Sequence, residues 1–209
     1  GHGGSDPGAT GNGLKEKDLN LSIARKTKAY LDNYFSGHET RLTRDSDITL
    51  PLNARPKMAN DWGADYFLSI HVNAGGGSGY EDFIYSGRVQ AQTSRLREVI
   101  HEYVSNAVDW GNRGKKRANF HVLRETKMPA MLTENGFIDN KSDAKLLKQD
   151  KVIGDIAKAH ALGLANAFNL GKKKKTDKRL NGTMYKVQVG AFLKKENAEK
   201  FARKLQADG

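Results

Sequence analysis

Apolar and polar positions repeat with two different periods along residues 1–170. Apolar residues that recur every three or four positions predict helices, and short apolar or alternating runs beside glycines predict strands. The predicted helices cover residues 16–35, 52–62, 89–110 and 151–168. The predicted strands cover residues 40–44, 65–71, 80–85, 120–124 and 130–134. Strands alternating with helices of this length predict an α/β fold, in which a central, mostly parallel sheet is flanked by helices in a three-layer domain.

Proline and glycine refine this pattern. Pro56 lies inside the second predicted helix. An interior proline costs about 3 kcal/mol, so we expect that helix to kink or to begin near Pro56. Residues 1–13 are rich in glycine and include an Asp-Pro-Gly sequence, which predicts a turn-rich loop. The chain opens directly on this loop, and we expect the strand that would lead into it to be missing.

The composition changes after residue 170. Residues 171–183 contain one apolar residue among lysines and other polar residues, which is typical of a solvated basic linker. Residues 184–209 then show a strand-like alternation followed by a helical apolar pattern. One strand and one helix cannot close a core, so these residues predict a truncated α+β module, ferredoxin-like by the resemblance given below. We therefore divide the chain into a domain at 1–170, a linker at 171–183 and a partial module at 184–209.

The charge of the chain is concentrated at its C-terminal end. The net charge is +11, with 35 Lys and Arg against 24 Asp and Glu. Residues 171–209 hold 12 of these basic residues and 4 of the acidic ones, which leaves 23 against 20 for the remainder. A basic tail suits any anionic polymer, including nucleic acid, teichoic acid or an acidic cell wall, and the charge alone does not distinguish these partners.

Candidate metal-binding and proton-transfer residues occur at four positions. His2 and His71 both stand where a predicted strand meets a glycine-rich loop, at the edge of an α/β sheet where ligands bind. Glu16 opens the first predicted helix, and Glu134 ends a predicted strand. The chain has no cysteine, so a transition metal would need His, Asp or Glu ligands. Two histidines and a carboxylate form the ligand set of a catalytic zinc site, and a further carboxylate can handle protons.

Each of these residues also has an ordinary interpretation. Glu16 could be an acidic residue that the dipole favours at a helix N-terminus, and Glu134 could be a surface residue at a strand end. The four remaining histidines are interpreted as packed or surface residues: His38, His101, His121 and His160. Of these, His121 is the one predicted to lie on a strand near the candidate site.

Four separated motifs resemble those of the zinc-dependent N-acetylmuramoyl-L-alanine amidases of type 3, which are bacterial cell-wall hydrolases. They are Gly-His-Gly-Gly-x-Asp-Pro-Gly-Ala at 1–9, Glu16 opening a helix, Phe-Leu-Ser-Ile-His-Val-Asn-Ala at 67–74, and Leu-Thr-Glu-Asn-Gly-Phe-Ile-Asp-Asn at 132–140. Within that family, the motifs resemble the lytic amidases of sporulating bacilli and their phages. The sequence Met-Tyr-Lys-Val-Gln-Val-Gly-Ala-Phe in the tail is similar to the start of a sporulation-related (SPOR) repeat, a peptidoglycan-binding module.

The resemblance implies a role for each candidate residue. It makes His2, Glu16 and His71 the ligands of one Zn²⁺ and makes Glu134 the catalytic carboxylate. Zinc would activate a water molecule, and Glu134 would act as its general base. The bond cleaved would join the lactyl group of N-acetylmuramic acid to the L-alanine of the stem peptide.

The resemblance also implies where the protein acts. The partners would be peptidoglycan and, through the basic tail, anionic wall polymers. The protein would be a monomer without a membrane span, reaching the wall or the extracellular space by secretion or cell lysis. No signal peptide is visible in the sequence.

Two other classes of function remain open at this point. A non-catalytic peptidoglycan-binding protein of the same fold would keep the domain and the tail but lack zinc or the catalytic carboxylate. A nucleic-acid-binding protein is less favoured, because residues 1–170 are nearly balanced in charge and their glycines match no phosphate-binding loop.

Overall fold

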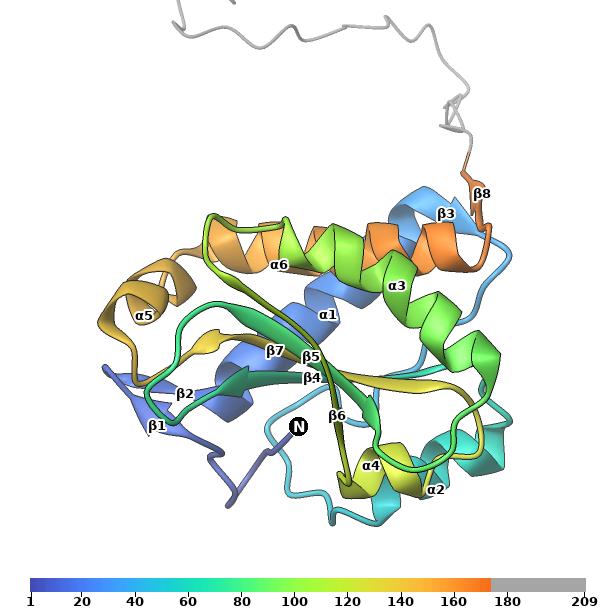
Figure 1. Cartoon of the computed structure of the whole chain (residues 1–209), viewed down its shortest axis with the longest axis horizontal. Coiled ribbons are helices and arrows are strands. Elements are labelled where there is room, and N and C mark those ends of the chain that lie inside the picture. The colour runs from blue at the N-terminus through green and yellow to red at the C-terminus, as the bar shows by residue number, and fades with distance from the viewer. Residues whose placement is uncertain (174–209) are drawn as a thin grey trace, which may run out of the picture. The chain divides into compact units, whose positions relative to one another are not determined.

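The computed structural model describes residues 1–173, which form an α/β domain of three layers (Figure 1). The helices are α1 (Glu16–Tyr34), α2 (Ala54–Trp62), α3 (Ala91–Ser105), α4 (His121–Arg124), α5 (Lys141–Leu147) and α6 (Asp150–Ala167). The strands are β1 (Thr10–Gly11), β2 (Leu14–Lys15), β3 (Phe35–Ser36), β4 (Phe67–Asn73), β5 (Tyr80–Tyr85), β6 (Asn112–Ala118), β7 (Ala130–Phe137) and β8 (Gly171–Lys172). None of the helices within residues 1–173 is long and apolar enough to cross a membrane.

The central sheet has four strands in the order β4-β7-β5-β6. β4 runs parallel to β7, β5 runs parallel to β6, and β5 runs antiparallel to β7. The sheet is therefore mixed, with parallel pairing at both outer positions. In this register His71 of β4 lies opposite Glu134 of β7, which in turn lies opposite Glu81 of β5. Since paired residues project from the same face, these three side chains form a row across the sheet.

One face of the sheet is covered by α1, α3 and α6. Ile70 and Val72 of β4 pack with Ile23 of α1 and Ile156 of α6 in one apolar cluster. A neighbouring cluster joins Met131 of β7 to residues of β5, α3 and α6. These contacts fix α1 against β4, so the first residue of α1 is held near the end of that strand.

The opposite face is covered by the shorter helices α2 and α4, which lie below the sheet in Figure 1. Phe67 and Leu132 pack there with Ala59 of α2 and with Val122 and Leu123 of α4. His71 follows Phe67 by four residues on β4, and Glu134 follows Leu132 by two residues on β7, so both lie beyond this apolar cluster. This face therefore begins as core and continues into the polar row that contains His71 and Glu134.

The buried carboxylate of Asp143 ties three segments together at the end of β7. It accepts hydrogen bonds from Ser78 Oγ at 2.7 Å, from the Gly79 amide at 2.8 Å and from the Phe137 amide at 2.9 Å. The helix that carries Asp143 begins at a side-chain cap, because Asn140 accepts from the amides of Ser142 and Asp143. The loop after β4 is thereby fixed to the end of β7.

The structure confirms most of the long elements expected from the pattern and corrects others. The helices expected at 16–35 and 151–168 and the strand at 80–85 agree with α1, α6 and β5 to within about one residue. The helix expected at 89–110 is shorter, because α3 ends at Ser105. Pro56 falls in the first turn of α2, where its missing amide hydrogen costs nothing, so the expectation that the helix begins near it holds.

Two predicted strands are wrong. Residues 40–44 form no regular element, because Arg44 turns inward and donates to the carbonyl oxygens of Ser46, Gly1 and Lys17 instead of pairing with a strand. Residues 120–124 form the short helix α4 rather than a strand, and Val122 and Leu123 cover the sheet from outside. A short apolar run does not distinguish a strand from a single buried helical turn.

Three further features were not predicted correctly. The edge strand β6 has the sequence Asn-Arg-Gly-Lys-Lys-Arg-Ala, which contains too few apolar residues to show a strand pattern. The helix α5 is also absent from the expected elements. The strand expected at 130–134 continues to Phe137, so Glu134 lies inside β7 rather than at its end.

We expect Asp143→Ala to lower the free energy of unfolding by about 3 kcal/mol, because it leaves three donors around a buried site without their acceptor. Urea unfolding followed by circular dichroism would measure this loss. Asp139→Ala is a matched control, because Asp139 accepts from the amides of Gly75 and Gly76 but is exposed. Equal losses in the two variants would contradict the role assigned to Asp143.

Candidate active site

The candidate site is assembled from three elements that are far apart in the sequence. His71 lies on β4, Glu16 is the first residue of α1, and His2 lies in the loop that precedes β1. At Gly8 this loop passes very close to the other elements. A Cβ atom there would lie only 2.6 Å from Glu16 Oε2 and 2.7 Å from His2 Cδ2, so a larger residue would clash. The φ of Gly8, +66°, is also one that other residues rarely adopt. Glycine at this position therefore permits the loop to pass over the site.

The side chains of His2, Glu16 and His71 converge on one point. One donor atom from each lies within 4.8 Å of the other two. Glu16 Oε2 is 3.2 Å from His2 Nε2, and Glu16 Oε1 is 2.8 Å from His71 Nδ1. The two imidazole rings are nearly perpendicular, with their centroids 5.2 Å apart. Two imidazoles and one carboxylate form a ligand set that suits zinc, so these three residues could hold a Zn²⁺ ion.

Glu16 is held as a carboxylate. It is 4% exposed and accepts hydrogen bonds from the amide of Ala9 at 2.9 Å and from Asn20 Nδ2 at 3.1 Å. Burial acts to raise the pKa of Glu16, but the hydrogen bonds with His2 and His71 outweigh it and hold the pKa far below its usual range. Glu16 therefore offers a fixed negative charge to a cation.

The two histidines differ in their electrostatics. Burial lowers the pKa of His71 to about 4, so its ring is neutral near pH 7 and can donate a lone pair. The pKa of His2 is raised, chiefly by its hydrogen bond with Glu16, although burial opposes the shift. A metal ion bound between His2 and Glu16 would displace that proton, so binding should release a proton from this pair.

Asp6 orients the ring of His2. His2 Nδ1 donates to Asp6 Oδ2 at 2.7 Å, which directs Nε2 toward Glu16. The other oxygen of Asp6 accepts from the amide of Gly8 at 3.0 Å. The main chain of His2 is anchored separately, because Arg55 Nη2 donates to its carbonyl oxygen at 2.9 Å. A carboxylate behind a histidine fixes its tautomer and makes it a better metal ligand.

Glu134 lies beside these donors with an unsatisfied oxygen. It is the cross-strand partner of His71, and its Oε2 is buried without a hydrogen-bond partner among residues 1–173. Burial raises the pKa of Glu134 well above its usual value, and the nearby charges of Glu16 and Glu81 add to the effect. A buried carboxylate with a free oxygen and a raised pKa is suited to accept and return a proton.

The structure brings together the four residues singled out from the sequence: His2, Glu16, His71 and Glu134. Asp6 and Glu81 are neighbours that the sequence reasoning missed. Asp6 lies in the recognised Asp-Pro-Gly turn, and Glu81 is a charged residue within a correctly predicted buried strand. Both signals were therefore visible in the sequence, but neither identifies the partner of its carboxylate.

The other four histidines lie outside this group. His160 is fully buried, where Thr133 Oγ1 and the carbonyl oxygen of Ile156 are its partners, and burial lowers its pKa to about 4. His101 Nδ1 bonds to the buried carboxylate of Asp82, and His38 bonds to its own loop. His121 lies on α4 and not on a strand as expected.

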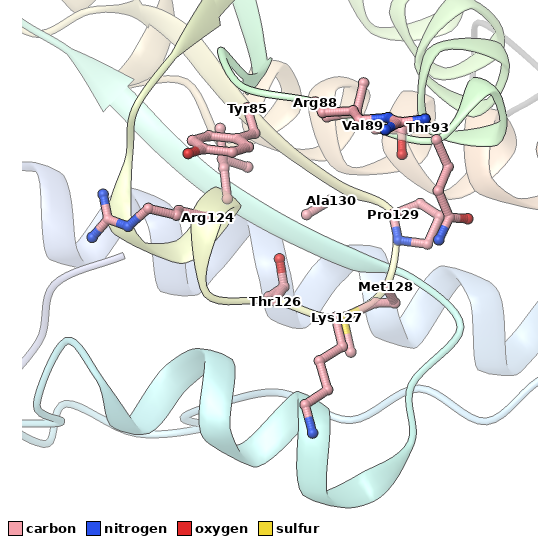
Figure 2. A pocket seen from close by; sticks show the side chains of 12 residues that line it. Tyr85, Arg88, Val89, Thr93, Arg124, Thr126, Lys127, Met128, Pro129 and Ala130 are labelled. Atoms are coloured by element: carbon pink, nitrogen blue, oxygen red, sulfur yellow. The ribbon is translucent and has the colours of Figure 1, made fainter.

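A separate cavity of about 180 Å³ lies beside the start of β7 (Figure 2). Its lining includes Tyr85, Arg88, Arg124, Lys127 and Pro129. None of the residues that line it is a histidine or a carboxylate, so it offers no metal-binding set or general base. The chemistry of the described residues therefore lies with His2, Glu16, His71 and Glu134 rather than in this cavity.

Comparison with known proteins gives two family matches. A family model described as N-acetylmuramoyl-L-alanine amidase matches residues 1–166, and a SPOR domain model matches residues 156–209. The chain is 54% identical over 209 residues to the sporulation-specific N-acetylmuramoyl-L-alanine amidase of Bacillus subtilis, covering all of this chain and 79% of that protein. It is 44% identical over 193 residues to the endolysin of Bacillus phage SPP1, covering 87% of this chain and 71% of that protein.

Solved structures show the same architecture. The catalytic domain of CwlV, an N-acetylmuramoyl-L-alanine amidase from Bacillus (Paenibacillus) polymyxa var. colistinus, aligns with a TM-score of 0.76 at 32% identity. The alignment covers 81% of this chain and 95% of that structure. N-acetylmuramoyl-L-alanine amidase AmiC2 of Nostoc punctiforme aligns with a TM-score of 0.74 at 33% identity, over 81% of this chain and 93% of that one.

We expect Asp6→Ala to weaken zinc binding by about 10- to 100-fold, because the His2 ring loses the group that fixes its tautomer and direction. Competition with a chromophoric chelator measures the affinity without relying on activity. Asp47→Ala is the matched control, because Asp47 Oδ1 holds the same loop through the Gly4 amide at 2.7 Å but does not touch His2. Equal loss in both variants would show that loop anchoring, and not histidine orientation, controls the affinity.

Proposed function

This chain is a peptidoglycan amidase of the N-acetylmuramoyl-L-alanine amidase family, and from that premise we propose that it uses one zinc ion and a glutamate base. His2, Glu16 and His71 would hold the ion, and Glu134 would move the proton. The observation that carries the proposal is the convergence of three donor atoms within 4.8 Å beside a buried carboxylate. The scissile bond is the amide between the lactyl group of N-acetylmuramic acid and L-alanine.

When bound, zinc supplies a Lewis acid that polarises the scissile carbonyl and makes a water molecule more acidic. The ionised Glu16 would balance part of the charge of the cation, and the neutral ring of His71 would contribute a lone pair. Asp6 keeps Nε2 of His2 directed at the same point. Hydrogen bonds already orient these side chains, which reduces the reorganisation needed during the reaction.

Glu134 takes the proton from the attacking water and returns it to the leaving amine of L-alanine. Its position opposite His71 in the parallel register keeps it beside the ligands. Burial and the charges of Glu16 and Glu81 raise its pKa, which brings its proton affinity closer to the range in which a group both accepts and returns a proton. A non-catalytic wall-binding protein is the less favoured alternative, because all four residues are present together.

We assign residues 1–170 to the catalytic domain, 171–183 to a basic linker and 184–209 to a partial SPOR module. The SPOR match begins inside α6, but Ile156 and Ala161 of that helix are fully buried against the rest of the catalytic domain. We therefore keep α6 with the catalytic domain. The partial module and most of the linker lie outside the described residues. The described part of the linker is residues 171–173, in which Gly171–Lys172 pairs with Phe35–Ser36.

The protein would act as a monomer at the cell wall or outside the cell. The proposed location rests on the peptidoglycan substrate and on the relatives named above. Digestion of purified walls tests the reaction directly, because an amidase releases new N-terminal alanine and creates no new reducing ends. Metal analysis of the same preparation should give one zinc per chain, and removal of zinc by a chelator should stop the release.

We expect Glu134→Gln to keep its fold and one equivalent of zinc but to lose hydrolysis by about 10²- to 10⁴-fold, as is typical when a general base is removed. Release of N-terminal alanine from walls measures the rate, and metal analysis checks the zinc. Glu102→Gln is the control, because Glu102 is exposed on α3. A Glu134→Gln rate within about threefold of the parent would exclude Glu134 as the base.

We expect removal of residues 174–209 to leave hydrolysis of a small soluble muropeptide unchanged and to weaken binding to intact walls. The cut after Lys173 keeps β8 paired with β3. The removed segment carries 10 Lys and Arg against 4 Asp and Glu, so it should attract anionic wall polymers in a salt-dependent way. Sedimentation with walls at low and high salt tests this. Binding by the full chain that persists at high salt would show recognition by more than charge.

A further inference from the structure

A second group of charged side chains lies next to Glu134 on the same face of the sheet. Glu81 of β5 is the antiparallel partner of Glu134 and is 4% exposed. Its Oε2 accepts from Arg113 Nε at 2.6 Å and from Lys116 Nζ at 2.5 Å, both of which come from β6. Its Oε1 accepts from Asn73 Nδ2 at 3.0 Å. Two cations therefore share one buried carboxylate, which leaves an excess of positive charge beside the candidate site.

Both cations are held in place and also accessible. The guanidinium of Arg113 lies over the ring of Phe137 at 4.9 Å, and Lys116 Nζ lies 5.8 Å from the centre of the Phe83 ring. The side chains of Arg113 and Lys116 are 38% and 37% exposed. Within residues 1–173 the hydrogen bond of Arg113 uses Nε, so its two terminal nitrogens are available to another acceptor. This fork of donors suits a carboxylate.

We propose that Arg113 and Lys116 form a subsite that binds a carboxylate on the peptide side of the substrate. The proposal rests on the amidase function proposed above, and it adds the group that the enzyme recognises next to the scissile bond. Glu81 is the buried carboxylate that positions both cations. The ring of Phe137 lies against Arg113, and the ring of Phe83 lies near Lys116.

The substrate offers a carboxylate on its peptide side. The lactyl carboxyl of N-acetylmuramic acid is consumed in the scissile amide, so the sugar side offers no anion there. The second residue of the stem peptide is a glutamate joined through its γ-carboxyl, which leaves its α-carboxyl as a free anion or an amide. The residue after L-alanine therefore carries a negative charge when its α-carboxyl is free and no charge when that group is amidated.

The reach also agrees. Neighbouring strands lie about 4.8 Å apart, so cations gathered at Glu81 lie about one strand spacing from the line of Glu134. An extended peptide advances about 3.3–3.6 Å per residue. A carboxylate one or two residues beyond the scissile bond can therefore reach Arg113 and Lys116 while the bond remains beside Glu134.

The experiment compares two peptides that differ at one group. The probes are L-alanyl-γ-D-glutamyl-L-lysinamide with the glutamate α-carboxyl either free or amidated, and titration calorimetry measures the binding of each. The proteins are the parent, Arg113→Gln, Lys116→Gln and the matched control Lys115→Gln. Lys115 carries the same charge on the same strand, but it pairs with Glu98 of α3 on the other face. Thermal unfolding and zinc content verify that each variant is folded.

The parent should bind the free acid about tenfold more tightly than the amide, as expected for a charge-assisted pair at a partly exposed site. Arg113→Gln and Lys116→Gln should each reduce this preference, and Lys115→Gln should keep it. A purely structural role for the two cations would weaken both peptides equally or neither, and equal affinity of the parent for acid and amide would overturn the proposal.

Hydrolysis of the corresponding muropeptides provides the second readout. The acid should show the lower KM with the parent, and the difference should shrink in Arg113→Gln while kcat changes little. Absence of hydrolysis by the parent would overturn the proposed function, whereas the calorimetric preference would still decide the subsite. The two proposals can thus fail separately.

Discussion

The parallel pairing of β4 with β7 is the constraint on which the whole site depends. It sets His71 opposite Glu134, and the antiparallel pairing of β7 with β5 then sets Glu134 opposite Glu81. A shift of one residue in either register would turn a whole strand's side chains to the other face of the sheet. Ile70, Val72 and Met131 prevent such a shift, because it would remove them from the core beneath α1, α3 and α6. The apolar side chains beneath α1, α3 and α6 therefore fix which residues stand opposite one another on the other face of the sheet.

The second face of the sheet is covered unevenly, and the site lies where its apolar cover ends. The apolar cluster around Phe67 and Leu132 is closed by α2 and α4, whereas the later positions of the same strands are charged. The loop that carries His2 and the first turn of α1 meet the sheet at these later positions. Gly8 permits the close approach of loop and helix, and Arg55 holds the main chain of His2. The paired strands and the anchored loop thus hold the side chains of the site together in one cluster.

Three carboxylates of this face are chemically alike in the sequence but differ in the folded chain. Glu16 and Glu81 both have a lowered pKa despite burial, because histidines surround the first and Lys116 and Arg113 surround the second. Glu134 lies between these two charges with an unpaired oxygen, and its pKa is raised. One carboxylate is therefore suited to a cation, one to anchoring basic side chains, and one to exchanging a proton. These differences come from the neighbours that folding supplies.

The sequence by itself determined the α/β class and most of the long elements, and it singled out the four residues that the fold brings together. Those residues occur in local motifs, since glycines, a turn and short apolar runs flank His2, His71 and Glu134. Local patterns could not determine β6, because an edge strand needs few apolar residues when it is paired on one side. They also could not separate a strand from the helical turn of α4, since both bury Val122 and Leu123.

Only the tertiary structure decided which side chains meet. The contact between Asp6 and His2 spans a turn, but those of Glu81 with Arg113 and Lys116 depend on the parallel pairing of β5 with β6 and on its irregular register near Asp82. The sequence shows the charge of each residue, but its pKa and its partner depend on burial and on distances across strands. Those distances are properties of the folded sheet, because residues that pair there lie far apart along the chain.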